Sequence, residues 1–152
     1  PAFMIAVAII FSPSLTRAQF VTHQYKDFEN ELLKYVNEYR KTINAKPLRM
    51  NLFIGNIAER HSRDLAAKKE ESNEAYKERM DKIYHQLKPV YSFAENVDTG
   101  RLSPKEVVEG WLRSPKHKKN LDGDYNFSGI GIVKDADSTM YITQIFILRQ
   151  QP

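Results

Sequence analysis

Glu95 is the residue of this sequence whose type and position most clearly point to chemistry. The segment from Tyr91 to Val97 (YSFAENV) alternates in polarity, which predicts a β-strand. In that strand Glu95 shares a face with Phe93 and Val97, so its carboxylate points where apolar side chains point. A buried carboxylate costs several kcal/mol unless it is paired or hydrogen-bonded. Glu95 therefore needs a partner, either in a functional site or as a support for nearby loop backbone, and the residues favour neither.

Four histidines are candidates for that partner. His61 falls on the apolar face of a predicted helix, a position more typical of a satisfied core residue than of a ligand. His23 precedes any regular pattern, and His85 lies in a charged segment that indicates a surface position. His117 follows a predicted helix start and has lysines on both sides, so it is either part of a solvated basic patch or the group that faces Glu95. We expect the second.

Several other chemistries are excluded. The 152 residues contain no cysteine, which removes disulfides, thiolate nucleophiles and cysteine-bound metals. No HxxxH, HExxH, GxSxG or glycine-rich phosphate loop occurs, and the glycines of the segment 129–133 (GIGIV) indicate close strand packing instead. A net charge of +4 is too small and too mixed to argue for nucleic acid binding.

The start of the chain has the pattern of a sorting signal. Residues 2–11 (AFMIAVAIIF) are apolar but too few to span a bilayer comfortably, and a small residue, Ala18, follows. We predict a signal peptide over residues 1–18 and a single domain over 19–152; the alternative is that the apolar run is a buried strand or helix. An exported domain without cysteines is more typical of bacteria than of eukaryotes.

The elements that must position Glu95 and His117 begin with three helical segments. Apolar residues from Phe28 to Ile43 recur on one helical face, with Asp27 as the predicted cap. A second helix is predicted from Asn51 to about Lys69. The charged segment 68–82 indicates a solvated helix or a mobile loop.

The second half of the chain combines helix starts with strands. Ser103 to Glu106 form a capping box with proline at the first helical position, and Ser114-Pro115 repeats that start signal. Segments 129–133 and 141–148 predict a hairpin. Because the last strand is apolar on both faces, it needs a cover on each side, which predicts a three-layer α/β/α sandwich with a mainly antiparallel sheet.

Five sequence motifs occur in a fixed order along the chain. Together they resemble the motifs of the CAP superfamily of cysteine-rich secretory, antigen-type and pathogenesis-related proteins, and most of all those of its cysteine-free bacterial branch. The resemblance covers about Glu29 to Leu148. The motifs, in order, are AERHSRDLA from Ala58, AENV from Ala94, VVEGWLRSPKHKKNL from Val107, and then FSGIGIV and YITQIF.

The resemblance implies a solvent-facing cleft, which in family members often holds two histidines and two acidic residues that can bind a divalent ion such as zinc. Glu95 and His117 match one glutamate and one histidine of that set. Ser114 stands at the position of the second acidic residue, and Asn73 is the nearest match to the first histidine. Two strong ligands make a poor zinc site, so we expect no cofactor; Glu95 and His117 would be the ligands if a metal did bind.

These observations predict a secreted or periplasmic CAP domain, monomeric, without a membrane span in its mature form. We expect it to be non-enzymatic and to bind a small, lipid-like or cell-envelope ligand near Glu95, Asn73, Ser114 and His117. One alternative is a hydrolase of an envelope polymer or peptide, metal-assisted or with His117 as general base oriented by Glu95. Another is an adhesion partner that uses the basic turn 116–119.

Overall fold

Helices and strands are interspersed along the described part of the chain. The computed structural model describes residues 25–69, 72–100 and 103–150, so the predicted signal segment over residues 1–18 lies outside the described residues. Within the described ranges no helix is both long and apolar enough to cross a bilayer. The elements are α2 (Lys26–Thr42), β1 (Arg49–Met50), α3 (Leu52–Ala66), α4 (Asn73–Gln86), β2 (Val90–Gly100), α5 (Pro104–Arg113), α6 (Pro115–Asp122), β3 (Phe127–Lys134) and β4 (Met140–Arg149).

The strands form one mixed sheet in the order β1-β3-β4-β2. The short strand β1 pairs with β3 in parallel, whereas β3 with β4 and β4 with β2 are antiparallel. The predicted hairpin is therefore confirmed as β3–β4, and the predicted strand at Tyr91 extends over the whole of β2. β2 lies at one edge of the sheet, where only one of its sides is paired with another strand.

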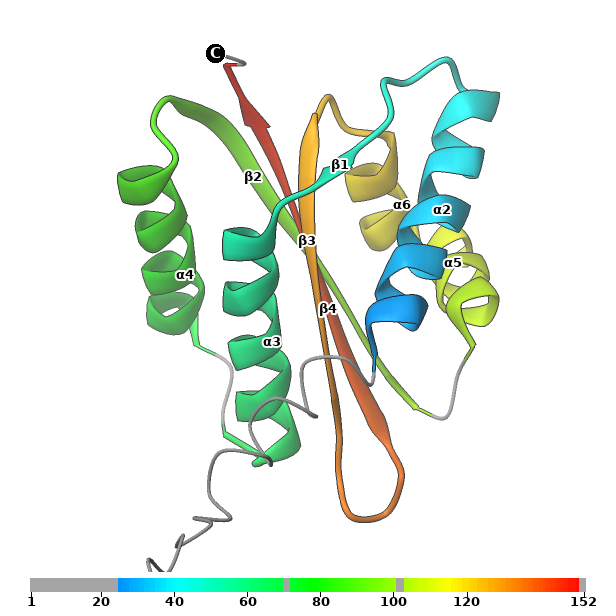
Figure 1. Ribbon diagram of the computed structural model, residues 1–152, viewed down its shortest axis with the longest axis vertical. Coiled ribbons are helices and arrows are strands. Elements are labelled where there is room, and N and C mark those ends of the chain that lie inside the picture. Colours follow the sequence, from blue (N-terminus) through cyan, green and yellow to red (C-terminus); the bar gives the residue numbers. More distant parts are fainter. Residues whose placement is uncertain (1–24, 70–71, 101–102, 151–152) are drawn as a thin grey trace, which may run out of the picture.

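Helices cover both faces of this sheet (Figure 1), with α3 and α4 on one side and α2, α5 and α6 on the other. Alternate residues of β4 supply the two cores: Ile145 and Ile147 pack in the cluster with α3, whereas Ile142 and Phe146 pack in the cluster that contains Trp111. All four side chains are fully buried or nearly so. The predicted α/β/α sandwich is confirmed, for the reason given: β4 is apolar on both faces.

The predicted helix starts are confirmed at three positions and wrong at one. Asn51 and Ser114 each accept a bond from the backbone N–H three residues on, and Ser103 forms the full capping box with Glu106. Asp27 is not a cap, because α2 already begins at Lys26 after a residue with no side-chain cap bond. Asp27 lies in the first turn instead, where its negative charge interacts favourably with the helix dipole.

The charged segment forms a helix from Asn73 onward. α4 begins after Ser72, whose side chain accepts a hydrogen bond from the Ala75 N–H. Ile83 is the one residue of α4 that is buried, and it packs in the cluster with Ile145. α4 is therefore a mostly solvated helix held to the sheet by few apolar contacts, and the loop alternative is wrong.

The glycines of β3 allow α3 to lie directly on the sheet. A Cβ on Gly131 would collide with the backbone at Glu59, and one on Gly129 would collide with the backbone at Ile54 and Gly55. The hydroxyl of Ser62, fully buried, donates to the Gly131 carbonyl at 2.9 Å and fixes the same contact. The glycine-rich segment thus serves close packing, here of a helix against a strand.

Gly131→Ala should lower the free energy of unfolding by at least about 2 kcal/mol, because neither backbone can yield to the added methyl group. Gly110→Ala is the matched control: its Cβ would meet only Asp98 Oδ2 at 3.6 Å, an ordinary contact. Since alanine is the better helix former, this control should be neutral or stabilising by up to about 1 kcal/mol. Urea denaturation of both variants measures the difference, and equal effects would contradict the close approach of α3 to β3.

Candidate functional site

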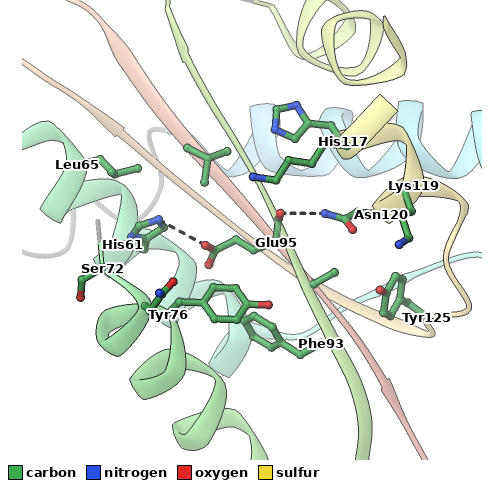
Figure 2. A pocket seen from close by; sticks show the side chains of 14 residues that line it. His61, Leu65, Ser72, Tyr76, Phe93, Glu95, His117, Lys119, Asn120 and Tyr125 are labelled. Carbon is green, nitrogen blue, oxygen red and sulfur yellow. Dashed lines mark hydrogen bonds and ion pairs between the residues drawn. The ribbon is translucent and has the colours of Figure 1, made fainter. Parts of the chain in front are cut away.

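A pocket of about 800 Å³ opens beside the edge strand β2. Side chains from four elements line it: α3 and α4 on one side, β2 at the floor, and α6 on the other side (Figure 2). Because no strand of the described residues lies beyond β2, both helical layers reach the same opening. Three of the predicted site residues line this pocket, namely Asn73, Glu95 and His117.

The Glu95 carboxylate is held by Arg79 and lies beside His61, both from the helices on its own side of the sheet. Arg79 donates two hydrogen bonds, from Nη2 to Oε1 at 2.8 Å and from Nε to Oε2 at 3.1 Å. His61 Nε2 lies 3.6 Å from Oε1 (Figure 2). The exposed fractions of the side chains are 8% for Glu95, 11% for Arg79 and 4% for His61. The buried Glu95 carboxylate is therefore neutralised by a bidentate ion pair with Arg79, the geometry that guanidinium groups favour with carboxylates.

His117 is not the partner of Glu95, which corrects the predicted pairing. The register of β2 with β4 places Glu95 opposite Ile145, on the face covered by α3 and α4. His117 belongs to α6, in the other layer, and its ring lies edge-on to Trp111 with 6.5 Å between ring centroids. Glu95 of the sheet and His117 of a helical layer thus line one pocket without forming a pair.

The environment of His117 favours the neutral imidazole. Burial lowers its pKa below the usual value of 6.5, and the charge of Lys116 lowers it further. The carboxylate of Asp98 acts in the opposite direction but does not compensate. A Glu95 partner would raise the pKa of His117, so the lowered pKa is further evidence against that pair.

Two asparagines join α6 to the edge strand. Asn120 Nδ2 donates to the Glu95 carbonyl at 3.0 Å and to Asn96 Oδ1 at 2.8 Å, and Asn96 Nδ2 donates to the His117 carbonyl at 3.1 Å. Asn96 is fully buried, so its amide is paired as a buried polar group must be. The network satisfies a carbonyl of the edge strand and fixes the side of the pocket that carries His117.

The sequence analysis missed these asparagines and Arg79. Both asparagines stand inside motifs that resemble the family. Asn96 shares a strand face with Ala94, opposite to Glu95, and in a sheet covered on both faces such an amide is a signal that could have found it. Arg79 had no such signal, because it lies in a segment of many charges where spacing distinguishes none. Ser114, a predicted cleft residue, is not among the lining side chains; it caps α6 and accepts from the His117 N–H at 3.5 Å.

The donor set does not fit the zinc site that the resemblance implies. Both carboxylate oxygens of Glu95 already accept hydrogen bonds from Arg79, whose positive charge stands where a metal ion would have to bind. No three His, Cys, Asp or Glu side chains come together anywhere in the ranges 25–69, 72–100 and 103–150 in a way that could hold an ion. Zinc sites in proteins take at least three such ligands.

The fold and the pocket at its sheet edge define a domain of the CAP type. The model of the cysteine-rich secretory protein (CAP) family matches residues 33–146, and the chain belongs to this family. Its sequence is 27% identical to that of the Bacillus subtilis protein YkwD over 112 residues, which are 72% of this chain and 44% of that protein. This chain therefore spans less than half of that relative.

Solved structures share the fold. An outer surface protein from Borrelia burgdorferi is 19% identical, with a TM-score of 0.70, over 84% of this chain and 96% of that one. A cysteine-rich secretory protein from Staphylococcus aureus is 22% identical, with a TM-score of 0.69, over 84% of this chain and 40% of that one. An extracellular protein with an SCP domain from Bacillus anthracis is 21% identical, with a TM-score of 0.66, over 81% and 41%.

Glu95→Gln should lower the free energy of unfolding by about 3–5 kcal/mol, because it leaves the buried Arg79 guanidinium without its counter-charge. Glu78→Gln is the control, since Glu78 pairs with Lys82 at the exposed surface of the same helix as Arg79, and we expect no change there. Denaturant titrations near neutral pH measure both.

Double-mutant cycles identify the partner of Glu95. Positions 95 and 79 should be coupled by about 0.5–3 kcal/mol, whereas positions 95 and 117 should be additive. Strong coupling of Glu95 to His117 instead would restore the predicted pair and contradict this structure.

The titration of His117 is a separate test. Nuclear magnetic resonance should give a pKa below 6.5 in the folded protein, whereas the same histidine in urea should titrate near its usual value. Since the unfolded chain then binds more protons, the contribution of His117 to stability should fall as the pH drops from above 6.5 through the folded pKa. His117→Gln should remove that part of the pH dependence. A folded pKa above the value in urea would contradict the described surroundings.

Proposed function

We propose that this chain is an exported, monomeric CAP domain that binds a small organic or lipid-like ligand in the pocket beside β2 and catalyses no reaction on it. The observation that carries the proposal is the pocket itself. Its volume of about 800 Å³ lies within the range of small-molecule sites, roughly 300–1,000 Å³. Such sites combine apolar surface with a few fixed polar groups, and this pocket has both.

The apolar part of the pocket is aromatic. Tyr76 of α4 packs edge-on against Phe93 of β2, with 5.3 Å between ring centroids, and Tyr125 lies at the α6 side (Figure 2). Tyr76 remains 37% exposed, so its ring has surface left for a ligand. Aromatic side chains give much contact area for little lost conformational freedom, which suits them to recognition.

The hydrolase alternative lacks its central geometry. A general base needs a group that orients it within hydrogen-bond distance, and Glu95 was the predicted one for His117. Glu95 is engaged by Arg79 and His61 instead. The neutral state of His117 would suit a base, but the described residues bring no three His, Cys, Asp or Glu side chains together that could hold a metal ion for it. The loss of the predicted Glu95 partner favours binding over catalysis.

Export is proposed on two grounds. The predicted signal segment over residues 1–18 is one, and the names of the structural relatives are the other: one is described as an outer surface protein, one as secretory and one as extracellular. A ligand of the cell envelope or its surroundings is therefore the natural class to test.

The test is a titration of the isotope-labelled protein with chitobiose, muramyl dipeptide, palmitate and lysophosphatidylcholine, followed by amide chemical shifts. At least one ligand should shift resonances of the segments 93–97 and 116–120 together. Tyr76→Ala should weaken that ligand by about tenfold or more, the loss typical of an aromatic anchor. Tyr91→Ala is the matched control, because Tyr91 is an exposed tyrosine of β2 outside the pocket.

Three results would overturn the proposal. One is the absence of any pocket-centred shift across the panel. The others are turnover of an envelope polymer that is lost in His117→Ala and stoichiometric zinc in the purified protein, either of which would revive the hydrolase alternative.

A further inference from the structure

We infer that the pocket selects organic anions, that is, a carboxylate or phosphate group attached to a ring, with Lys116 and Lys119 as the groups that receive the negative charge. The inference rests on the proposed function, since it names the class of ligand for the same pocket. It follows from how the charges around the pocket are paired.

The one acidic side chain among the described residues that line the pocket is already neutralised. Glu95 forms a bidentate ion pair with Arg79 and has His61 beside it, so it offers no free negative charge to a ligand. Asp98 of the same strand is not among the lining residues; its Oδ1 accepts from the Thr99 N–H at 2.8 Å. Repulsion of an anion by the lining carboxylate is therefore small, and Asp98, whose charge acts on His117, lies outside the lining.

Two lysines of α6 bring positive charge to the pocket. Lys116 and Lys119 are three positions apart, so they lie on the same face of the helix, and both line the pocket. Both are exposed, and neither forms an ion pair with any carboxylate in the part of the chain that the structure describes. Lys118, between them, differs: its Nζ lies 2.6 Å from Asp122 Oδ2 and 5.5 Å from the centre of the Tyr39 ring.

One of the lysines lies on the same side of the pocket as an aromatic ring. In Figure 2, Lys119 and Tyr125 lie on the α6 side of the pocket, and His117 lies on the side opposite Tyr76. A ring that contacts Tyr125 would direct a short anionic substituent toward the α6 side, which carries both lysines. The neutral His117 adds a hydrogen-bonding group at the same side without a charge of its own.

The experiment compares pairs of ligands in which one member carries an added acidic substituent, titrated into the full chain at low salt. N-acetylmuramic acid is paired with N-acetylglucosamine, and phenyl phosphate with phenol. In at least one pair the anionic member should bind about tenfold more tightly, since each exposed ion pair contributes up to about fivefold. The pair that responds shows whether the pocket prefers a carboxylated sugar or an aryl phosphate. Raising the salt should weaken the anionic member alone.

Charge-matched variants assign the effect to the two lysines. The Lys116→Gln/Lys119→Gln double variant should lose the preference for the anionic member. Lys105→Gln/Lys118→Gln removes the same net charge from lysines that pair with Glu109 and Asp122, and should retain the preference. Glutamine keeps the side chain nearly as long, and all four positions lie on helix surfaces, so both variants should fold.

The possible negative results have different consequences for the inference and for the proposed function. Equal binding of the charged and uncharged members overturns this inference and leaves the proposed function intact. A preference that both double variants lose equally also overturns it, because long-range charge would then be the cause. If no member of either pair shifts the pocket resonances while a ligand of the wider panel does, the inference fails alone; if the wider panel fails too, the proposed function fails with it.

Discussion

The strand β4 buries side chains on both of its faces, and the rest of the molecule is arranged around that requirement. Ile145 and Ile147 need one apolar cover, and Ile142 and Phe146 need another. Helices on both sides of the sheet supply these covers. Glycines at 129 and 131 let α3 lie directly on β3. Because β3 and β4 are the inner strands, β2 is left at an edge, and there the two helical layers meet around one opening.

This edge position explains the division of labour in the pocket. Successive side chains of a strand point to opposite faces, so Glu95 and Asn96 serve different layers. Glu95 binds Arg79 and faces His61 on the α3 and α4 side, whereas Asn96 and Asn120 hold α6 on the other side. The strand between them keeps the carboxylate and His117 apart. The sequence predicts one acid–base site shared by Glu95 and His117. The structure has instead two separate groups of side chains that line a common opening.

The two sides of the pocket are also held with different strength. α6 is tied to the edge strand by the asparagine network, and its end is fixed by the buried Arg40, which donates to the carbonyls of Leu121 and Gly123. α4 has Ile83 as its one buried residue and is otherwise attached through the Tyr76–Phe93 contact and the Arg79–Glu95 pair. The pair that neutralises the pocket therefore also positions one of its sides. Loss of that charge pair would change both the shape and the electrostatics of the opening.

The sequence by itself determined the layers, the helix starts at Asn51, Ser103 and Ser114, and the inward direction of Glu95, because periodicity and capping are local patterns. It also determined, through its motifs, the family and the presence of His117 near the cleft. Only the tertiary structure decided the partner of Glu95. Arg79 is one cation among many in a charged helix, and which of them reaches a carboxylate depends on how two layers pack, which no local spacing records.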